Sequence, residues 1–153
     1  MPNILDDIDK AIINRIQSEF PIASRPYLEL ANELDLTEKE VLDRVARLKN
    51  DGIIRRIGGN FVPDKLGFVS TLCAARVPAD KIDHFAKIVN RYPGVTHNYQ
   101  RDNQYNVWFT FISPSMDEIE TNLKKIAAES GVSDILNLPA TKVFKIKAQF
   151  DVS

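Results

Sequence analysis

Apolar residues recur at helical spacing through the first part of the chain. Residues 5–20 place isoleucines on one helical face and aspartates in the first turn, where the helix dipole favours acidic side chains. Pro26 suits the first turn of a second helix over residues 26–35, whose leucines and alanine form its apolar face. Two helices are therefore predicted before residue 36.

A third helix is predicted from its capping residues. Thr37 and Glu40 have the spacing of a capping box, and Gly52 marks the end of the helix that follows. Residues 53–57 are expected to form the first strand of a small wing. Three short helices and a wing predict a winged helix-turn-helix domain over residues 1–63.

After residue 63 the pattern alternates between strands and helices. In chain order we expect strands at residues 68–77, 95–101, 105–112 and within 141–151, with helices at residues 80–90 and 116–130. This βαββαβ order predicts a ferredoxin-like domain over residues 64–153 and places the chain in the α+β class. Helices would cover one face of the sheet, and we expect a second subunit to cover the other.

Composition and charge narrow the function classes. The chain has 153 residues, 44% hydrophobic and 27% charged, with a net charge of −1. Residues 1–63 carry nine basic and eleven acidic side chains, and the third helix begins with Glu38 and Glu40, which disfavours DNA binding. With neither a membrane-spanning run nor a signal-peptide pattern, we expect a cytoplasmic protein. The single cysteine, Cys73, lies among apolar residues and is expected to be buried rather than nucleophilic.

Candidate chemistry is concentrated in the segment GVTHNYQRDNQYNVWFT, residues 94–110. In an extended chain, alternation puts His97, Tyr99 and Arg101 on one face. A three-residue turn at 102–104 would set Tyr99 opposite Val107 and His97 opposite Phe109. Tyr105 would then join that face, and Trp108 would lie on the other as a core or interface residue.

The whole chain resembles the Lrp/AsnC transcriptional regulators, which combine a helix-turn-helix domain with a βαββαβ domain that binds effectors. The segment at 94–110, together with GIIRRIGGNF (52–61) and KLGF (65–68), resembles the siroheme decarboxylases, and within them the alpha-type subunit. This resemblance implies a carboxy-lyase that works in a heterodimer with a homologous beta-type subunit. It would remove two acetate carboxyls from siroheme, giving 12,18-didecarboxysiroheme on alternative routes to haem b or haem d1.

Such a reaction needs cations to hold carboxylates and a group to protonate the product. We expect His97 to be the proton donor or a proximal ligand of the siroheme iron, with Tyr99 assisting and Arg101 gripping a carboxylate. The other substrate-binding candidates are Arg55, Arg56, Tyr105 and Arg76. No cofactor is expected beyond siroheme as substrate, and no metal site of the protein's own.

Other interpretations of the same residues stay open. Arg55, Arg56 and Arg76 can equally be solvated surface residues, and a single histidine such as His97 is often structural. The helix-turn-helix pattern alone favours a regulator that senses a small ligand or a tetrapyrrole. A third interpretation is a subunit that the assembly needs but that is catalytically silent.

Overall fold

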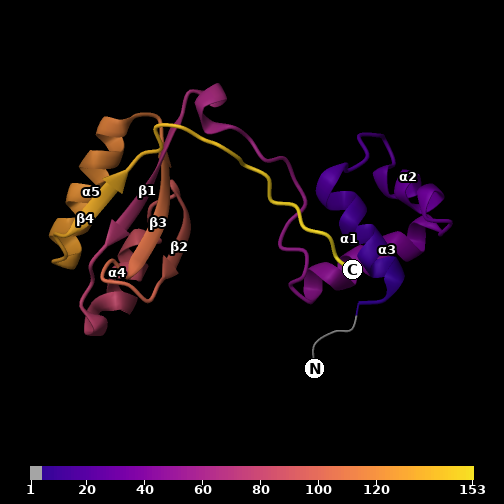
Figure 1. Ribbon diagram of the computed structural model, residues 1–153, viewed down its shortest axis with the longest axis horizontal. Helices are drawn as coiled ribbons and strands as arrows, with labels where there is room; N and C mark the ends of the chain where they lie inside the picture. The colour runs from indigo at the N-terminus through magenta and orange to yellow at the C-terminus, as the bar shows by residue number, and fades with distance from the viewer. Residues whose placement is uncertain (1–4) are drawn as a thin grey trace. The chain divides into compact units, whose positions relative to one another are not determined.

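The computed structural model describes residues 5–153 and confirms the α+β class (Figure 1). The chain forms two compact units. A helical unit contains residues 5–59 together with Lys145–Ser153, and a sheet unit contains Asn60–Phe144.

The helical unit has the three predicted helices, α1 (Asp7–Ser18), α2 (Pro26–Glu33) and α3 (Glu38–Asn50). They pack around a small apolar core formed by Ile12, Leu30, Ala31, Val41 and Val45. The predicted helix starts are confirmed, because Pro26 occupies the first turn of α2 and the Thr37–Glu40 capping box opens α3.

Two expected strands are placed differently by the structure. The wing strand expected at residues 53–57 is absent, since those residues form turns and irregular backbone. The last strand, β4, is Ile135–Leu138 rather than a stretch within residues 141–151. Apolar residues in a short stretch predict a strand only where a neighbouring strand is available to pair with it, and neither expected stretch pairs with a strand.

The sheet unit contains four antiparallel strands in the order β2-β3-β1-β4. Its strands are β1 (Val69–Ala75), β2 (Val95–Gln100), β3 (Val107–Ser113) and β4, its α-helices are α4 (Ile82–Val89) and α5 (Met116–Ser130), and its short 3₁₀ helices are η1 (Pro63–Leu66) and η2 (Ala79–Lys81). The predicted βαββαβ order is therefore confirmed.

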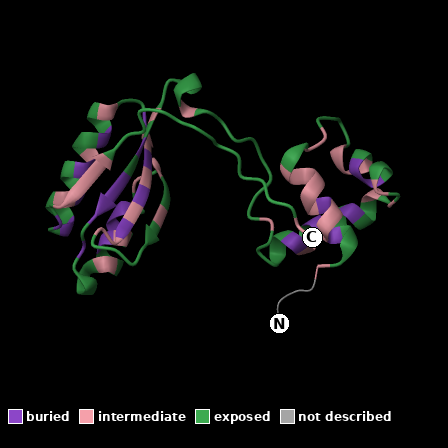
Figure 2. Cartoon of the chain, viewed as in Figure 1, coloured by how far each residue is buried: buried purple, intermediate pink, exposed green. Residues whose placement is uncertain are grey.

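One face of this sheet is buried under α4 and α5 (Figure 2). Along β3 the residues alternate between fully buried and half-buried, with Val107, Phe109 and Phe111 facing the helices. We call the opposite side the outer face. It carries Leu72 and Leu138, which are 39% and 42% exposed, so the outer face includes apolar side chains that this chain's helices do not cover.

The loop before β2 approaches β3 too closely for any side chain at its centre. A Cβ atom added to Gly94 would lie 2.1 Å from the carbonyl oxygen of Ile112, and the Gly94 carbonyl accepts a hydrogen bond from the Ile112 amide. Only glycine fits here, so Gly94 fixes where β2 begins.

Candidate functional site

The register between β2 and β3 decides which side chains share the outer face. Tyr99 pairs with Trp108 and His97 with Thr110, and an irregularity lies between Val95 and His97. The expected register, which set Tyr99 opposite Val107, is wrong by one residue. The turn has four residues, 102–105, rather than the expected three, because the Arg101 amide donates to the Asn106 carbonyl. As a result Trp108 lies on the same face as Tyr99.

An aromatic and cationic cluster forms at this place, and we call it the outer-face cluster: His97, Tyr99, Arg101 and Trp108. The guanidinium carbon of Arg101 lies 5.5 Å from the ring centre of Tyr99 and 5.8 Å from that of Trp108. The rings of His97 and Tyr99 are 6.0 Å apart. A cation held over two rings is oriented without losing its charge, so it remains able to bind an anion.

The outer-face cluster is accessible. His97 and Arg101 are exposed, and Tyr99 is 46% exposed. The Nδ1 atom of His97 lies 3.1 Å from the hydroxyl of Thr96, so Nε2 is the ring nitrogen left to meet a ligand. The Trp108 side chain is held in place by a hydrogen bond, in which its indole Nε1 donates to the Tyr105 carbonyl oxygen at 2.6 Å.

Two further candidates, Arg76 and Tyr105, are joined through a residue that the sequence did not reveal. The Tyr105 hydroxyl donates to Asp134 at 3.0 Å, and Arg76 Nε lies 3.3 Å from the other carboxylate oxygen. The Arg76 guanidinium also sits 5.2 Å from the Tyr105 ring centre. Asp134 directly precedes β4, and because that strand was expected further along the chain, nothing in the sequence placed Asp134 beside these two residues.

The remaining candidates, Arg55 and Arg56, follow α3 in the helical unit and are exposed. Arg56 donates to the Gly59 carbonyl oxygen at 3.1 Å. The structure thus brings five of the seven candidates together on the sheet unit, in the outer-face cluster and the neighbouring Arg76–Tyr105 pair.

The connection between β2 and β3, which carries Arg101, is held by Asn106. Its side-chain amide donates to the Val77 carbonyl at 2.8 Å and accepts from the Val77 amide at 2.9 Å. Its backbone bonds link the end of β1 to Arg101. Asn106 therefore fixes the backbone on which Arg101 is mounted.

A hollow on the sheet unit lies away from the outer-face cluster. It has a volume of about 460 Å³ and is lined by residues of the Gly94 loop, β3 and α5, among them Phe111, Ile112 and Glu118. Its one charged lining residue is acidic, so a ligand bearing several carboxylates is disfavoured there. The charges therefore favour the outer-face cluster over this hollow as the site for such a ligand.

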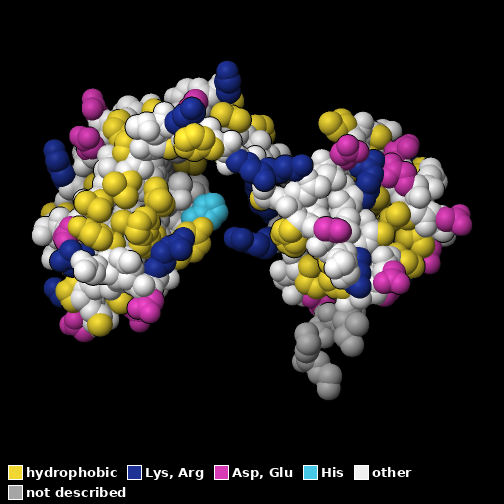
Figure 3. Space-filling view, viewed as in Figure 1, with side chains coloured by type: hydrophobic (Ala, Val, Ile, Leu, Met, Phe, Trp, Pro, Cys, Tyr) yellow, Lys and Arg dark blue, Asp and Glu magenta, His cyan; other side chains and the backbone are white. Residues whose placement is uncertain are grey.

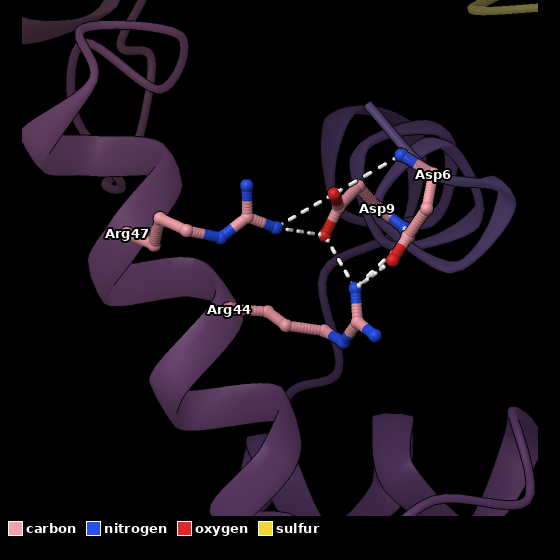
Figure 4. A network of polar contacts seen from close by, with 4 residues as sticks. All are labelled: Asp6, Asp9, Arg44 and Arg47. Carbon is pink, nitrogen blue, oxygen red and sulfur yellow. Dashed lines mark hydrogen bonds and ion pairs between the residues drawn. The ribbon is translucent and has the colours of Figure 1, made fainter. Parts of the chain in front are cut away.

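The arginines of α3 are bound by carboxylates of α1 and its N-cap (Figure 4). Arg47 Nη2 lies 2.6 Å from both carboxylate oxygens of Asp9, and Arg44 Nη1 contacts Asp9 at 2.8 Å and Asp6 at 2.7 Å. Asp9 is only 1% exposed. Burial raises the pKa of its carboxyl group, but hydrogen bonds from Arg47 and Arg44 outweigh that effect and hold the pKa below its usual value.

Two further ion pairs lie on this helix or between it and the preceding one. Lys39 pairs with Asp43 at 2.6 Å, and Arg25 pairs with Glu38. Acidic and basic side chains are interspersed over the visible face of the helical unit (Figure 3). Charges of both signs mixed on a surface attract phosphates less than the basic face with which helix-turn-helix proteins bind DNA.

Cys73 is fully buried, as predicted, and burial raises the pKa of its thiol to about 12. Residues 5–153 contain no group of three or more His, Cys, Asp or Glu side chains placed to hold a metal ion. Nor does a helix in that range have the length and apolar character needed to cross a bilayer.

Comparison with protein families matches both parts of the chain. Residues 9–55 match the siroheme decarboxylase NirDL-like HTH domain, and residues 65–145 match the AsnC-like ligand binding domain. The siroheme decarboxylase alpha subunit of Desulfovibrio desulfuricans is 56% identical over 146 residues, which are 95% of this chain and 84% of that protein. The alpha subunit of Nitratidesulfovibrio vulgaris is 49% identical over 97% of this chain and 84% of that protein.

Solved structures give the same picture. The siroheme decarboxylase NirDL in complex with an iron-uroporphyrin III analogue superposes with a TM-score of 0.66 at 31% identity, covering 94% of this chain. The chain spans about half of that longer protein, 48%. The leucine response regulatory protein LrpA of Mycobacterium tuberculosis has a higher TM-score, 0.81, but at 19% identity it shows a shared fold alone.

Proposed function

This chain belongs to the siroheme decarboxylase family, and we propose that it is a subunit of a carboxy-lyase that removes two acetate carboxyls from siroheme to give 12,18-didecarboxysiroheme. The observation that carries the proposal is the outer-face cluster, in which Arg101 lies over two aromatic rings next to His97. A flat tetrapyrrole needs rings to stack on, and its carboxylates need a cation. The cluster offers both within one patch.

The proposed chemistry balances for each acetate. The bond between the methylene and carboxylate carbons breaks, carbon dioxide leaves with neither of the bonding electrons, and the methylene carbon takes up one proton to become a methyl group. Arg101 holds a carboxylate through its planar guanidinium. His97 supplies the proton through Nε2 or holds the siroheme iron, and Tyr99 orients the imidazole and the substrate. Siroheme is the substrate, and the proposal needs no further cofactor.

Arg76 and Tyr105 have a different place in this proposal. Both already contact Asp134, so their charge and hydroxyl group are partly occupied. We assign them to the edge of the substrate site, where Arg76 can hold a peripheral carboxylate of the ring. Arg55 and Arg56, on the helical unit, stay predictions as substrate-binding residues.

The partner in this proposal is a homologous beta-type subunit. The outer face leaves Leu72 and Leu138 exposed, and hydrophobic side chains gather on the visible surface of the sheet unit (Figure 3). A second subunit laid on this face would bury those leucines and exclude water from the outer-face cluster, which strengthens electrostatic contacts with the substrate.

A regulator of transcription is the alternative, and the charges of α3 count against it. Its two central arginines are held by Asp6 and Asp9, so they cannot contact phosphates without breaking those pairs. Low-salt gel retardation is a stringent test, because low salt strengthens even non-specific binding. Sequence-selective retention of DNA would favour the regulator.

The decisive experiment is reconstitution of the chain with its beta-type partner. Siroheme incubated with the complex should lose the mass of two carbon dioxide molecules, and unchanged siroheme would refute the proposal. His97→Ala should lower the turnover rate more than siroheme affinity. His84→Ala is the matched control, because His84 is exposed on α4, which covers the opposite face of the sheet. Full activity of the complex with His97→Ala would remove the proposed role of His97 and would favour the interpretation of this chain as a catalytically silent subunit.

A further inference from the structure

The C-terminal residues of the chain lie against the first helix (Figure 1). Two side chains of α1 make the contacts. The Gln17 amide donates to the Phe150 carbonyl at 2.6 Å and accepts from the Phe150 amide at 3.2 Å. The Asn14 amide donates to the Val152 carbonyl at 3.2 Å and accepts from the Val152 amide at 2.9 Å.

The spacing on both sides explains why the two sets of groups match. Asn14 and Gln17 are three residues apart, so they project from one face of α1. Phe150 and Val152 are two residues apart, so in an extended chain their backbone groups point to the same side. Each carboxamide offers one acceptor and two donors, enough to satisfy the N–H and C=O of one residue as a neighbouring strand would.

Two additional contacts give the arrangement order and selectivity. Gln17 Nε2 also donates to the Asn14 side-chain oxygen at 3.1 Å, which holds the two amides in register. Asn14 Nδ2 lies 3.1 Å from the Asp151 carboxylate, so the residue between the two docked ones is also recognised. Backbone bonds alone would accept any extended peptide, whereas this contact favours an acidic side chain at the central position.

We propose that Asn14 and Gln17 form a docking site on α1 for an extended peptide, and that its occupant is the chain's own C-terminal segment Phe150–Val152. The segment is held by hydrogen bonds rather than by burial, since Phe150 remains 72% exposed. Such a contact is reversible. The chain leaves the helical unit after Gly59 and returns to it at Lys145, so the docked segment provides a second link between the units.

Backbone ¹⁵N relaxation of the full chain tests the proposal. The amides of Phe150 and Val152 should have order parameters near those of the helices, roughly 0.85, and the double variant Asn14→Ala/Gln17→Ala should lower them below about 0.6. Gln149→Ala is the matched control, because it removes an amide from the same segment that makes none of these bonds. A mobile segment in the unaltered chain, or one that stays ordered in the double variant, would overturn the proposal.

A second measurement covers the case in which the double variant folds poorly. Removing the last five residues should move the side-chain amide signals of Asn14 and Gln17, and adding the five-residue peptide QFDVS should move them back. Signals that ignore the truncation would contradict the docking site. Dilution separates the two possible sources of the segment: loss of order on dilution would show docking from another copy and overturn the intramolecular assignment.

Discussion

Removing the carboxylate of Asp9 should lower the free energy of unfolding of the helical unit. Asp9→Asn preserves the shape and the capping oxygen but removes the charge that Arg44 and Arg47 share. Breaking a buried ion pair by removing one partner costs about 3–5 kcal/mol. Here Arg44 keeps Asp6, and the Arg47 side chain is 41% exposed and can turn to water, so we expect a smaller loss of about 2–3 kcal/mol.

Two spectroscopic probes can localise this loss. Far-ultraviolet circular dichroism follows all the helices, whereas fluorescence of Trp108, the only tryptophan, follows the sheet unit. The variant should lower the melting temperature of the helical unit by roughly 10–20 °C, from about 4–8 °C per kcal/mol in a unit of this size. The Trp108 transition should stay where it is if the units unfold separately.

The control and the pH dependence sharpen the test. Asp43→Asn is the control: it breaks an exposed ion pair with Lys39 and should lower the free energy of unfolding by less than about 1 kcal/mol. Because the folded pKa of Asp9 is lowered, its contribution is complete above its unfolded value of about 3.9 and is lost as the pH falls through the lower folded value. Equal stability of the two variants, or an unchanged acid transition in Asp9→Asn, would refute the reasoning.

Three further predictions concern the sheet unit. Gly94→Ala should lower the free energy of unfolding of this unit by about 3 kcal/mol, because the added carbon meets the Ile112 carbonyl oxygen; a urea titration followed by Trp108 fluorescence measures the loss, and an unchanged midpoint would contradict it. Asn106→Ala should lower the free energy of unfolding by about 2–3 kcal/mol, because it leaves both Val77 backbone groups unpaired. Asn106→Asp keeps the acceptor for the Val77 amide and should lower it less, as measured by thermal unfolding. Arg101→Lys should weaken siroheme binding about tenfold, near 1.4 kcal/mol, in a spectral titration, because lysine keeps the charge but loses the planar fork; unchanged affinity would remove Arg101 from the site.

The sequence predicted those parts of the fold that local signals determine. Pro26 and the Thr37–Glu40 capping box act within a few residues, so the starts of α2 and α3 could be placed from the chain alone. The strand expected at residues 105–112 is likewise confirmed as β3, Val107–Ser113. The stretch within 141–151 has a similar pattern, but it has no strand to pair with, and part of it docks on α1 instead.

The candidate site was predicted less completely because it depends on register and on distant partners. Placing Tyr99 opposite Val107 put Trp108 on the wrong face, and a one-residue difference in a turn is not visible in residue types. Asp9 was noted only as an acidic residue in a first turn, although its partners lie 35 and 38 positions away on α3. Asp134 was missed for the same reason, since its contacts with Arg76 and Tyr105 exist only in the folded sheet.

The buried thiol of Cys73 can report how often the sheet opens. Its thiol lies in β1, a central strand, and with a pKa of about 12 only roughly one in 10⁵ molecules carries the reactive thiolate at neutral pH. A thiol reagent can therefore label the chain only when the sheet opens, and the labelling rate counts those openings. Since the chain has no other cysteine, the slowing of that rate when a partner subunit binds would measure how firmly the partner holds the sheet closed.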